Sequence, residues 1–131
     1  MISHLFVGAT DFDRALAFYE PVLGALGLEL RFCERERPWA GWQKPGEVRE
    51  PMFLLGKPFE GEHQPGNGHM VAFVANSRSL VDLVYQTALA QGGTSEGAPG
   101  LRPEYHANYY GAYFRDTEGN KLCVACHAAD G

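Results

Sequence analysis

The chain has 131 residues, enough for one domain or for two half-size units that share one core. Hydrophobic residues make up 45% and aromatic residues 12%, which excludes an intrinsically disordered chain. The net charge of −5, with 11 Lys and Arg scattered along the sequence, excludes the basic patch of a nucleic-acid-binding protein. There is no apolar run of membrane-spanning length and no signal-peptide pattern, and three Cys without framework spacing are typical of reduced thiols. We therefore expect a cytoplasmic protein without a nucleic-acid or membrane partner.

The first half of the chain begins with a strand and a helix. Residues 2–8 form a short apolar run that contains His4 and predicts a strand. Thr10 is the expected helix cap, with carboxylates in the first turn. An apolar helix face follows at helical spacing, made of Phe12, Ala15, Leu16, Tyr19 and Leu23.

Strands follow this helix. Glycines at 24 and 27 are expected to end it, and residues 28–33 resume as a strand. Residues 39–42 are a weaker strand candidate and 51–56 a stronger one. The stretch 57–68 is rich in Pro and Gly and predicts a linker.

The second half repeats this order. Residues 69–75 predict a strand, and Asn76 or Ser77 caps a helix that ends at Gly92-Gly93. Residues 94–104 predict a loop, with a short strand at its start as the alternative, and this stretch leads into a hairpin with strands at 109–115 and 121–127. Since side chains alternate along a strand, Cys123 and His127 are expected on one surface.

An internal duplication explains the agreement between the halves. A shift of 65 positions puts His4 on His69, the first helix face on Val81, Val84 and Ala88, and Gly27 on Gly92, without a gap. The fold class predicted from this repeat is α+β, with two βαβββ modules. Module 1 covers about residues 1–57 and module 2 about 69–128, and the linker joins them within a single domain.

The sequence resembles the vicinal oxygen chelate superfamily, which includes glyoxalase I, bleomycin-resistance proteins and type I extradiol dioxygenases. The resemblance is carried by His4, the helix from Asp11 to Tyr19, the run His69–Phe73, and the ending Tyr113–Leu122. It implies that the sheets of the two modules form a curled cup with the helices outside. It also implies a homodimer and a divalent metal at the base of the cup.

The resemblance also implies which residues would hold the metal. The family's ligand positions fall on His4, His69 and the fourth residue after the turn glycine, which is Cys123 where the family has Glu. A thiolate with two imidazoles favours Zn²⁺ over Mn²⁺ or Fe²⁺. Each residue also has a structural interpretation, as a strand-end His or a small core thiol, so a cup without metal stays open.

Other residues are candidates for the ligand pocket. Phe6, Phe73, Tyr109 and Tyr113 have strand positions compatible with lining the cup, or with filling it as core. His106 lies on the loop before the hairpin, where it is a candidate acid/base or a solvated loop residue. Arg102 is a candidate for gripping a substrate carboxylate, and a surface salt bridge is the alternative.

Two functional hypotheses follow, and a purely structural dimeric module stays open as a third class. The first is a glyoxalase-like enzyme in which the metal chelates vicinal oxygens of a small molecule and stabilises an enolate-like intermediate. Lyase or isomerase chemistry of the lactoylglutathione-lyase type is preferred over dioxygenase chemistry, because Cys123 replaces the carboxylate. The alternative is a metal-free protein that binds or sequesters a small molecule, as bleomycin-resistance proteins do.

Overall fold

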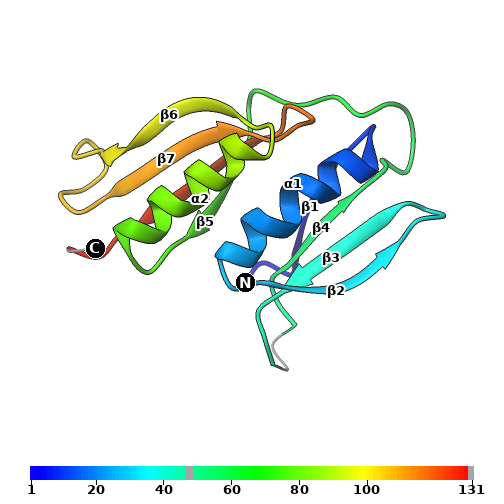
Figure 1. Cartoon of the computed structure of the whole chain (residues 1–131), viewed down its shortest axis with the longest axis horizontal. Helices are drawn as coiled ribbons and strands as arrows, with labels where there is room; N and C mark the ends of the chain where they lie inside the picture. The colour runs from blue at the N-terminus through cyan, green and yellow to red at the C-terminus, as the bar shows by residue number, and fades with distance from the viewer. Residues whose placement is uncertain (47–48, 130–131) are drawn as a thin grey trace.

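The computed structural model describes residues 1–46 and 49–129 and shows an α+β fold of two similar modules (Figure 1). Module 1 contains β1 (His4–Gly8), α1 (Phe12–Ala25), β2 (Glu29–Glu34), β3 (Trp39–Gln43) and β4 (Met52–Gly56). Module 2 contains β5 (Val71–Val74), α2 (Arg78–Ala90), β6 (Thr94–Leu101), β7 (Tyr110–Arg115) and β8 (Lys121–Cys126). Both modules have the predicted βαβββ order.

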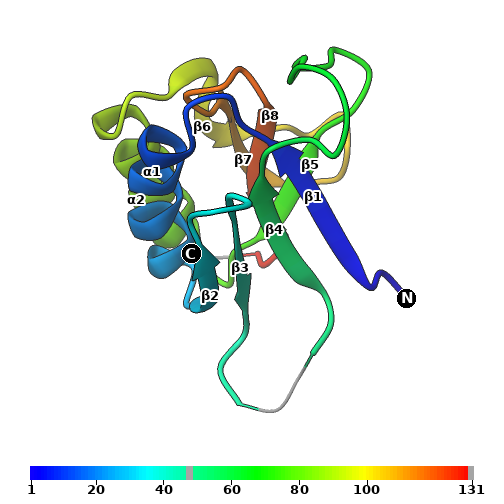
Figure 2. The ribbon, with the colours of Figure 1, turned by 90° about the vertical axis from the view of Figure 1, so that its right-hand side faces the viewer.

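Each module forms one four-stranded mixed sheet. The strand orders are β1-β4-β3-β2 and β5-β8-β7-β6, and the first strand of each module pairs in parallel with its last strand. The sheets are open, consistent with the predicted curled cup. The helices α1 and α2 contact each other and lie on one side of the molecule (Figure 2).

The two modules share one hydrophobic core. The predicted helix-face residues Leu16, Tyr19 and Leu23 are all buried, and so is the predicted face of α2, made of Val81, Val84 and Ala88. The ring of Phe53 on β4 lies 5.2 Å from the ring of Tyr19 and 5.5 Å from the ring of Phe73 on β5. Because Phe53 and Phe73 belong to different modules, aromatic packing joins the two sheets directly.

The hairpin turn of module 2 binds the start of α1. Glu118 accepts hydrogen bonds from the backbone N–H groups of Thr10 and Asp11, at 2.9 and 2.8 Å. A carboxylate is favourable there because it satisfies free N–H groups at the positive end of the helix. The cap residue is Asp11, which accepts from the N–H of Arg14, so the prediction of Thr10 as the cap was wrong.

The same turn has a buried carboxylate at its centre. One oxygen of Asp116 accepts from the N–H groups of Glu118 and Asn120, each at 2.8 Å. The other accepts from the hydroxyl of Tyr19 and from the Asn120 side chain. That side chain also donates to the carbonyl of Gly8 at 2.9 Å, so the turn ties β1 and α1 of module 1 to module 2.

The internal repeat is present, but it does not have a single register. The caps Asp11 and Ser77 are 66 positions apart, whereas Gly27 and Gly92, which both have positive φ, are 65 apart. The difference arises because α1 has 14 residues and α2 has 13. At the ends of the first strands the offset is also 66, since the N–H groups of Ala9 and Ala75 donate in the same way to the carbonyls of Gly56 and Ala125, so His4 corresponds to Met70 rather than to His69.

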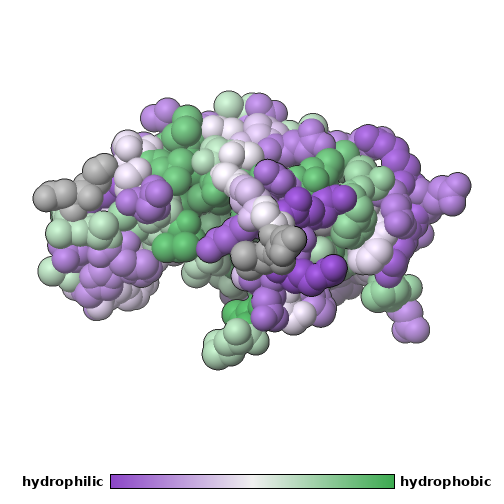
Figure 3. Space-filling view, turned by 90° about the horizontal axis from the view of Figure 1, so that it is seen from below, coloured by the Kyte–Doolittle hydropathy of each residue, from purple (hydrophilic) through white to green (hydrophobic). Residues whose placement is uncertain are grey.

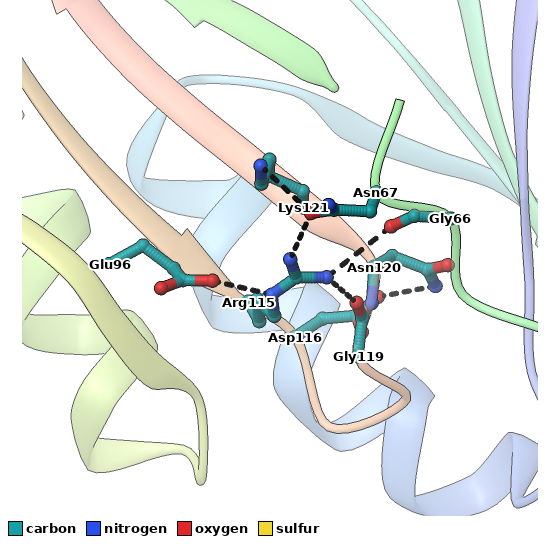
Figure 4. Close-up of polar contacts among 8 residues, drawn as sticks. All are labelled: Gly66, Asn67, Glu96, Arg115, Asp116, Gly119, Asn120 and Lys121. Atoms are coloured by element: carbon teal, nitrogen blue, oxygen red, sulfur yellow. Dashed lines mark hydrogen bonds and ion pairs between the residues drawn. The ribbon is translucent and has the colours of Figure 1, made fainter. Parts of the chain in front are cut away.

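The strand β6 is longer than expected. Residues 94–101 form an eight-residue strand where the sequence predicted a loop with at most a short strand at its start, although Gly and Pro interrupt its pattern. It pairs with β7 through two register shifts, which accommodate these residues. Arg115 on β7 adds an ion pair to Glu96 at 2.6 Å and donates to Gly119 and to Gly66 of the linker (Figure 4).

In the described ranges, no helix is long and apolar enough to cross a membrane. Apolar side chains nevertheless reach the surface, including Phe6, Met70 and Val74, which are 44%, 42% and 70% exposed. The face seen from below is mostly hydrophilic, with one hydrophobic area left of its middle and another on the right (Figure 3).

Candidate functional site

The side of the module 2 sheet that is turned away from α2 carries a cluster of chemically active side chains. We call this side the open face and define it by the paired residues Tyr113 and Cys123, together with Ala72 beside Cys123 on β5. The opposite side, with Phe114, Leu122 and Val124, belongs to the core. Strand alternation alone fixes this division.

The loop between β6 and β7 completes the cluster. The N–H of Arg102 donates to the carbonyl of Tyr109 at 2.8 Å, and the N–H of Tyr109 donates to the carbonyl of His106 at 3.2 Å. These bonds fold the loop back over the sheet. Gly111 leaves room for it, because a Cβ there would lie 2.8 Å from the ring of Tyr109. The loop therefore brings its His and Tyr side chains to the open face.

Cys123 lies beneath two tyrosines. Its side chain has no exposed surface, and its Sγ is 3.6 Å from the hydroxyl of Tyr109. That hydroxyl is 2.8 Å from the hydroxyl of Tyr113. Burial raises the pKa of Cys123, although the two tyrosine hydroxyls and the charge of Arg102 act in the opposite direction. At neutral pH the thiol is therefore protonated.

The tyrosines are neutral as well. Burial and then the hydrogen bonds to Tyr113 and Cys123 raise the pKa of Tyr109. Burial also raises the pKa of Tyr113, against a smaller opposing effect of the Tyr109 hydroxyl. All three groups thus keep their hydrogens and act as donors as well as acceptors.

Arg102 brings the positive charge to this cluster. Its guanidinium carbon lies 5.5 Å from the centre of the Tyr113 ring, and its Nη2 donates to the carbonyl of Ala98 at 2.8 Å. Glycines make the space: a Cβ at Gly97 or Gly100 would lie 3.3 or 3.0 Å from the guanidinium nitrogens. The repeated Gly in this segment therefore positions Arg102 against the sheet.

His106 and His127 form a hydrogen-bonded pair at the edge of the cluster. His106 Nε2 is 2.8 Å from His127 Nδ1, and the N–H of Asn108 donates to His106 Nδ1. Because Nδ1 of His106 is an acceptor, the hydrogen of the neutral ring lies on Nε2, which then donates to His127. Both rings stand at an angle to the ring of Tyr109, with centres 5.7 and 5.4 Å away.

The three predicted metal ligands are not gathered in this structure. His4 is exposed and forms a hydrogen bond with Ser3. His69 lies against Gly66 of the linker, where a Cβ would come within 2.0 Å of the ring. Cys123 is buried under Tyr109. Within residues 1–46 and 49–129, no three His, Cys, Asp or Glu side chains are close enough to hold one ion, so this donor set does not fit the implied metal.

Two of the predicted pocket residues also lie apart from the cluster. Phe73 faces the core and packs on Phe53, on the other side of the sheet from Tyr113 and Cys123, which agrees with the second of its two interpretations, as a core residue. Phe6 faces a separate hollow of about 350 Å³ between β1 and the start of β8. This hollow is also lined by His63, His69, Asn120 and Lys121.

The structure thus brings together Arg102, His106, Tyr109, Tyr113 and Cys123 of the predicted site residues. It adds His127 and Tyr105, whose ring centre is 4.9 Å from that of Tyr109. The sequence placed His127 on one surface with Cys123 but did not make it a predicted site residue. Only the folding of the loop onto β8 reveals its partner, although its place on the same strand face as Cys123 was a usable signal. The arrangement can bind a ligand through aromatic rings, neutral hydroxyl donors and one cation.

Burial of these groups predicts a loss of stability at alkaline pH. In the unfolded chain Cys123 titrates near its ordinary pKa of 9.0, whereas the folded chain retains the proton to higher pH. Above about pH 9 the unfolded state binds fewer protons, so the free energy of unfolding falls as pH rises. Urea unfolding between about pH 7.5 and 10.5 should show this fall, and Cys123→Ala should reduce its slope. A free energy of unfolding that stays constant over this range would contradict the burial of these groups.

Comparisons with known proteins agree with the fold. A sequence model of the Glyoxalase/Bleomycin resistance protein/Dioxygenase superfamily matches residues 1–124. A glyoxalase/bleomycin resistance protein from Albidiferax ferrireducens is 31% identical, with a TM-score of 0.83, and the similarity covers 98% of this chain and 99% of that one.

More distant structures share the architecture. A lactoylglutathione lyase from Agrobacterium tumefaciens is 24% identical with a TM-score of 0.68, covering 96% of this chain and 92% of that chain. A glyoxalase/bleomycin resistance protein/dioxygenase family enzyme from Burkholderia phytofirmans is 20% identical with a TM-score of 0.70, covering 96% and 98%. A search of the curated proteins found no match. On the family match and the first of these structures, the chain belongs to the Glyoxalase/Bleomycin resistance protein/Dioxygenase superfamily.

Proposed function

We propose that this chain binds a small organic molecule on the open face of module 2. The observation that carries the proposal is the chain of contacts from Tyr113 through Tyr109 to Cys123, with Arg102 beside it. Aromatic rings supply apolar contact area, and a few placed polar groups fix orientation, which is the composition of small-molecule sites. Of the two hypotheses from the sequence, this supports the small-molecule binding protein.

Metal-dependent lyase or isomerase chemistry stays a prediction from the family resemblance. It would require His4, His69 and Cys123 to converge on one ion, and in the described residues they do not. A homodimer is likewise a proposal that rests on the family resemblance. These predictions can be tested by the metal content and the mass of the purified chain in solution.

The binding proposal can be tested with a neutral aromatic probe, phenylacetamide, titrated into ¹⁵N-labelled protein. We expect shifts of backbone signals on β7 and β8, centred on Gly111 and Ala125, because these residues lie on the open face. Tyr109→Ala should lower the affinity for the probe several-fold, since one aromatic contact contributes about 0.5–1.5 kcal/mol. Phe59→Ala is the matched control, because Phe59 is 87% exposed on the linker.

Two results would contradict the proposal. One is a set of shifts confined to the hollow near Phe6 and His69, because the ligand would then bind between the modules. The other is one Zn²⁺ per chain that is lost in Cys123→Ala, because the thiol would then be a metal ligand and the metal hypothesis would be correct.

A further inference from the structure

Arg102 differs from Arg115 in that no carboxylate of the residues that the structure describes neutralises its charge. Arg115 forms an ion pair with Glu96 and donates to backbone carbonyls and to Asn67 (Figure 4). For Arg102, the contacts within the described chain are the carbonyl of Ala98 and the ring of Tyr113, and no carboxylate lies within ion-pair distance. The residue as a whole is half-buried, and an unpaired charge is costly where access to solvent is reduced.

The neighbouring polar groups do not supply a negative charge. Tyr109, Tyr113 and Cys123 are kept neutral by burial, so the cluster as a whole carries the single positive charge of Arg102. The half-buried surface around it is therefore electrostatically suited to an anion.

The number of hydroxyl and thiol hydrogens in the cluster also favours a ligand that accepts hydrogen bonds. Two tyrosine hydroxyls and one thiol carry three hydrogens, and the two contacts between these groups use two of them. One hydrogen is left to donate. In one arrangement Cys123 donates to Tyr109 and Tyr109 donates to Tyr113, which leaves the hydroxyl of Tyr113 free to donate, and the ring of Tyr113 lies 5.5 Å from the guanidinium carbon of Arg102.

We infer that the ligand of the open face is an aromatic carboxylate, with its carboxylate held by Arg102 and the Tyr113 hydroxyl and its ring placed against Tyr109. A guanidinium presents donors in a plane that matches the two oxygens of a carboxylate. This inference rests on the proposed binding function and adds the chemical class of the ligand.

The test compares phenylacetate with phenylacetamide, which has the same ring and nearly the same shape but no charge. Wild-type protein should bind phenylacetate at least about tenfold more tightly, because the anion gains charge-assisted hydrogen bonds. Arg102→Gln should remove this preference, so that phenylacetate and phenylacetamide bind to the variant with similar affinity. Arg102→Lys keeps the charge but lacks the planar set of donors that can bind both carboxylate oxygens, so it should retain only part of the preference.

Matched variants separate the site from general charge effects. Arg35→Gln makes the same change of charge at an exposed ion pair with Asp13, and should not alter phenylacetate binding beyond the error of the titration. Tyr113→Phe should lower the affinity for phenylacetate a few-fold more than the affinity for phenylacetamide, because the hydroxyl that donates to the carboxylate is lost. The midpoint of thermal unfolding of each variant shows whether it is folded at the titration temperature.

The outcomes are distinguishable. Equal affinity for the two probes, or a preference that survives Arg102→Gln in a folded protein, would overturn the inference while the binding function stands. If neither probe binds to the wild-type protein, both proposals are wrong. A preference lost equally in Arg35→Gln would mean that net charge, and not Arg102, attracts the anion.

Discussion

Replacing Asp116 with alanine is expected to cost about 3–5 kcal/mol of the free energy of unfolding, measured by urea titration. The side chain is 3% exposed and accepts four hydrogen bonds from Glu118, Asn120 and Tyr19. Truncation leaves these donors buried without an acceptor, and each unsatisfied group costs about 1–3 kcal/mol. The loss is large because the turn joins the two modules.

Asp116→Asn sharpens this test. The asparagine can still accept from the two backbone N–H groups, but its NH₂ then faces the NH₂ of Asn120, which is held by the carbonyl of Gly8. We expect a smaller loss than for alanine. Asp13→Ala is the control, because Asp13 is 76% exposed and its ion pair with Arg35 is solvated. Equal small losses in all three variants would show that the turn does not hold the modules together.

Replacing Phe53 with alanine should have an effect of similar size. The ring packs on Tyr19, Trp42 and Phe73, at centre distances of 5.2, 6.3 and 5.5 Å, and the residue is 3% exposed. Removing a buried Phe costs about 3–5 kcal/mol through lost burial and the cavity that remains. Because Phe53 and Phe73 come from different modules, the unfolding transition should also become less cooperative.

The matched control is Phe59→Ala, since the ring of Phe59 is 87% exposed. It should change the free energy of unfolding by no more than about 0.5 kcal/mol, as exposed substitutions do. If Phe53→Ala were equally mild, the two sheets would not share a core at this point.

The sequence by itself determined the module order, the helix faces and the strand alternation, because each depends on local periodicity and turn chemistry. The burial of Leu16, Tyr19 and Leu23 follows from helical spacing, and the shared face of Tyr113 and Cys123 from the two-residue period of a strand. Arg102, His106 and Tyr109 join this pair on the open face only because the loop between β6 and β7 folds back over the sheet.

Only the tertiary structure decided the contacts between segments that are distant in the chain. The cap of α1 is completed by Glu118, more than a hundred residues later, and His106 meets His127 because the loop folds over β8. The one-residue difference in helix length moves His69 out of the position of His4, which the gap-free repeat did not reveal. Phe73 faces the core because the register of β5 against β8 places it beside Val124 rather than Cys123, and strand pairing is not a local property of the sequence.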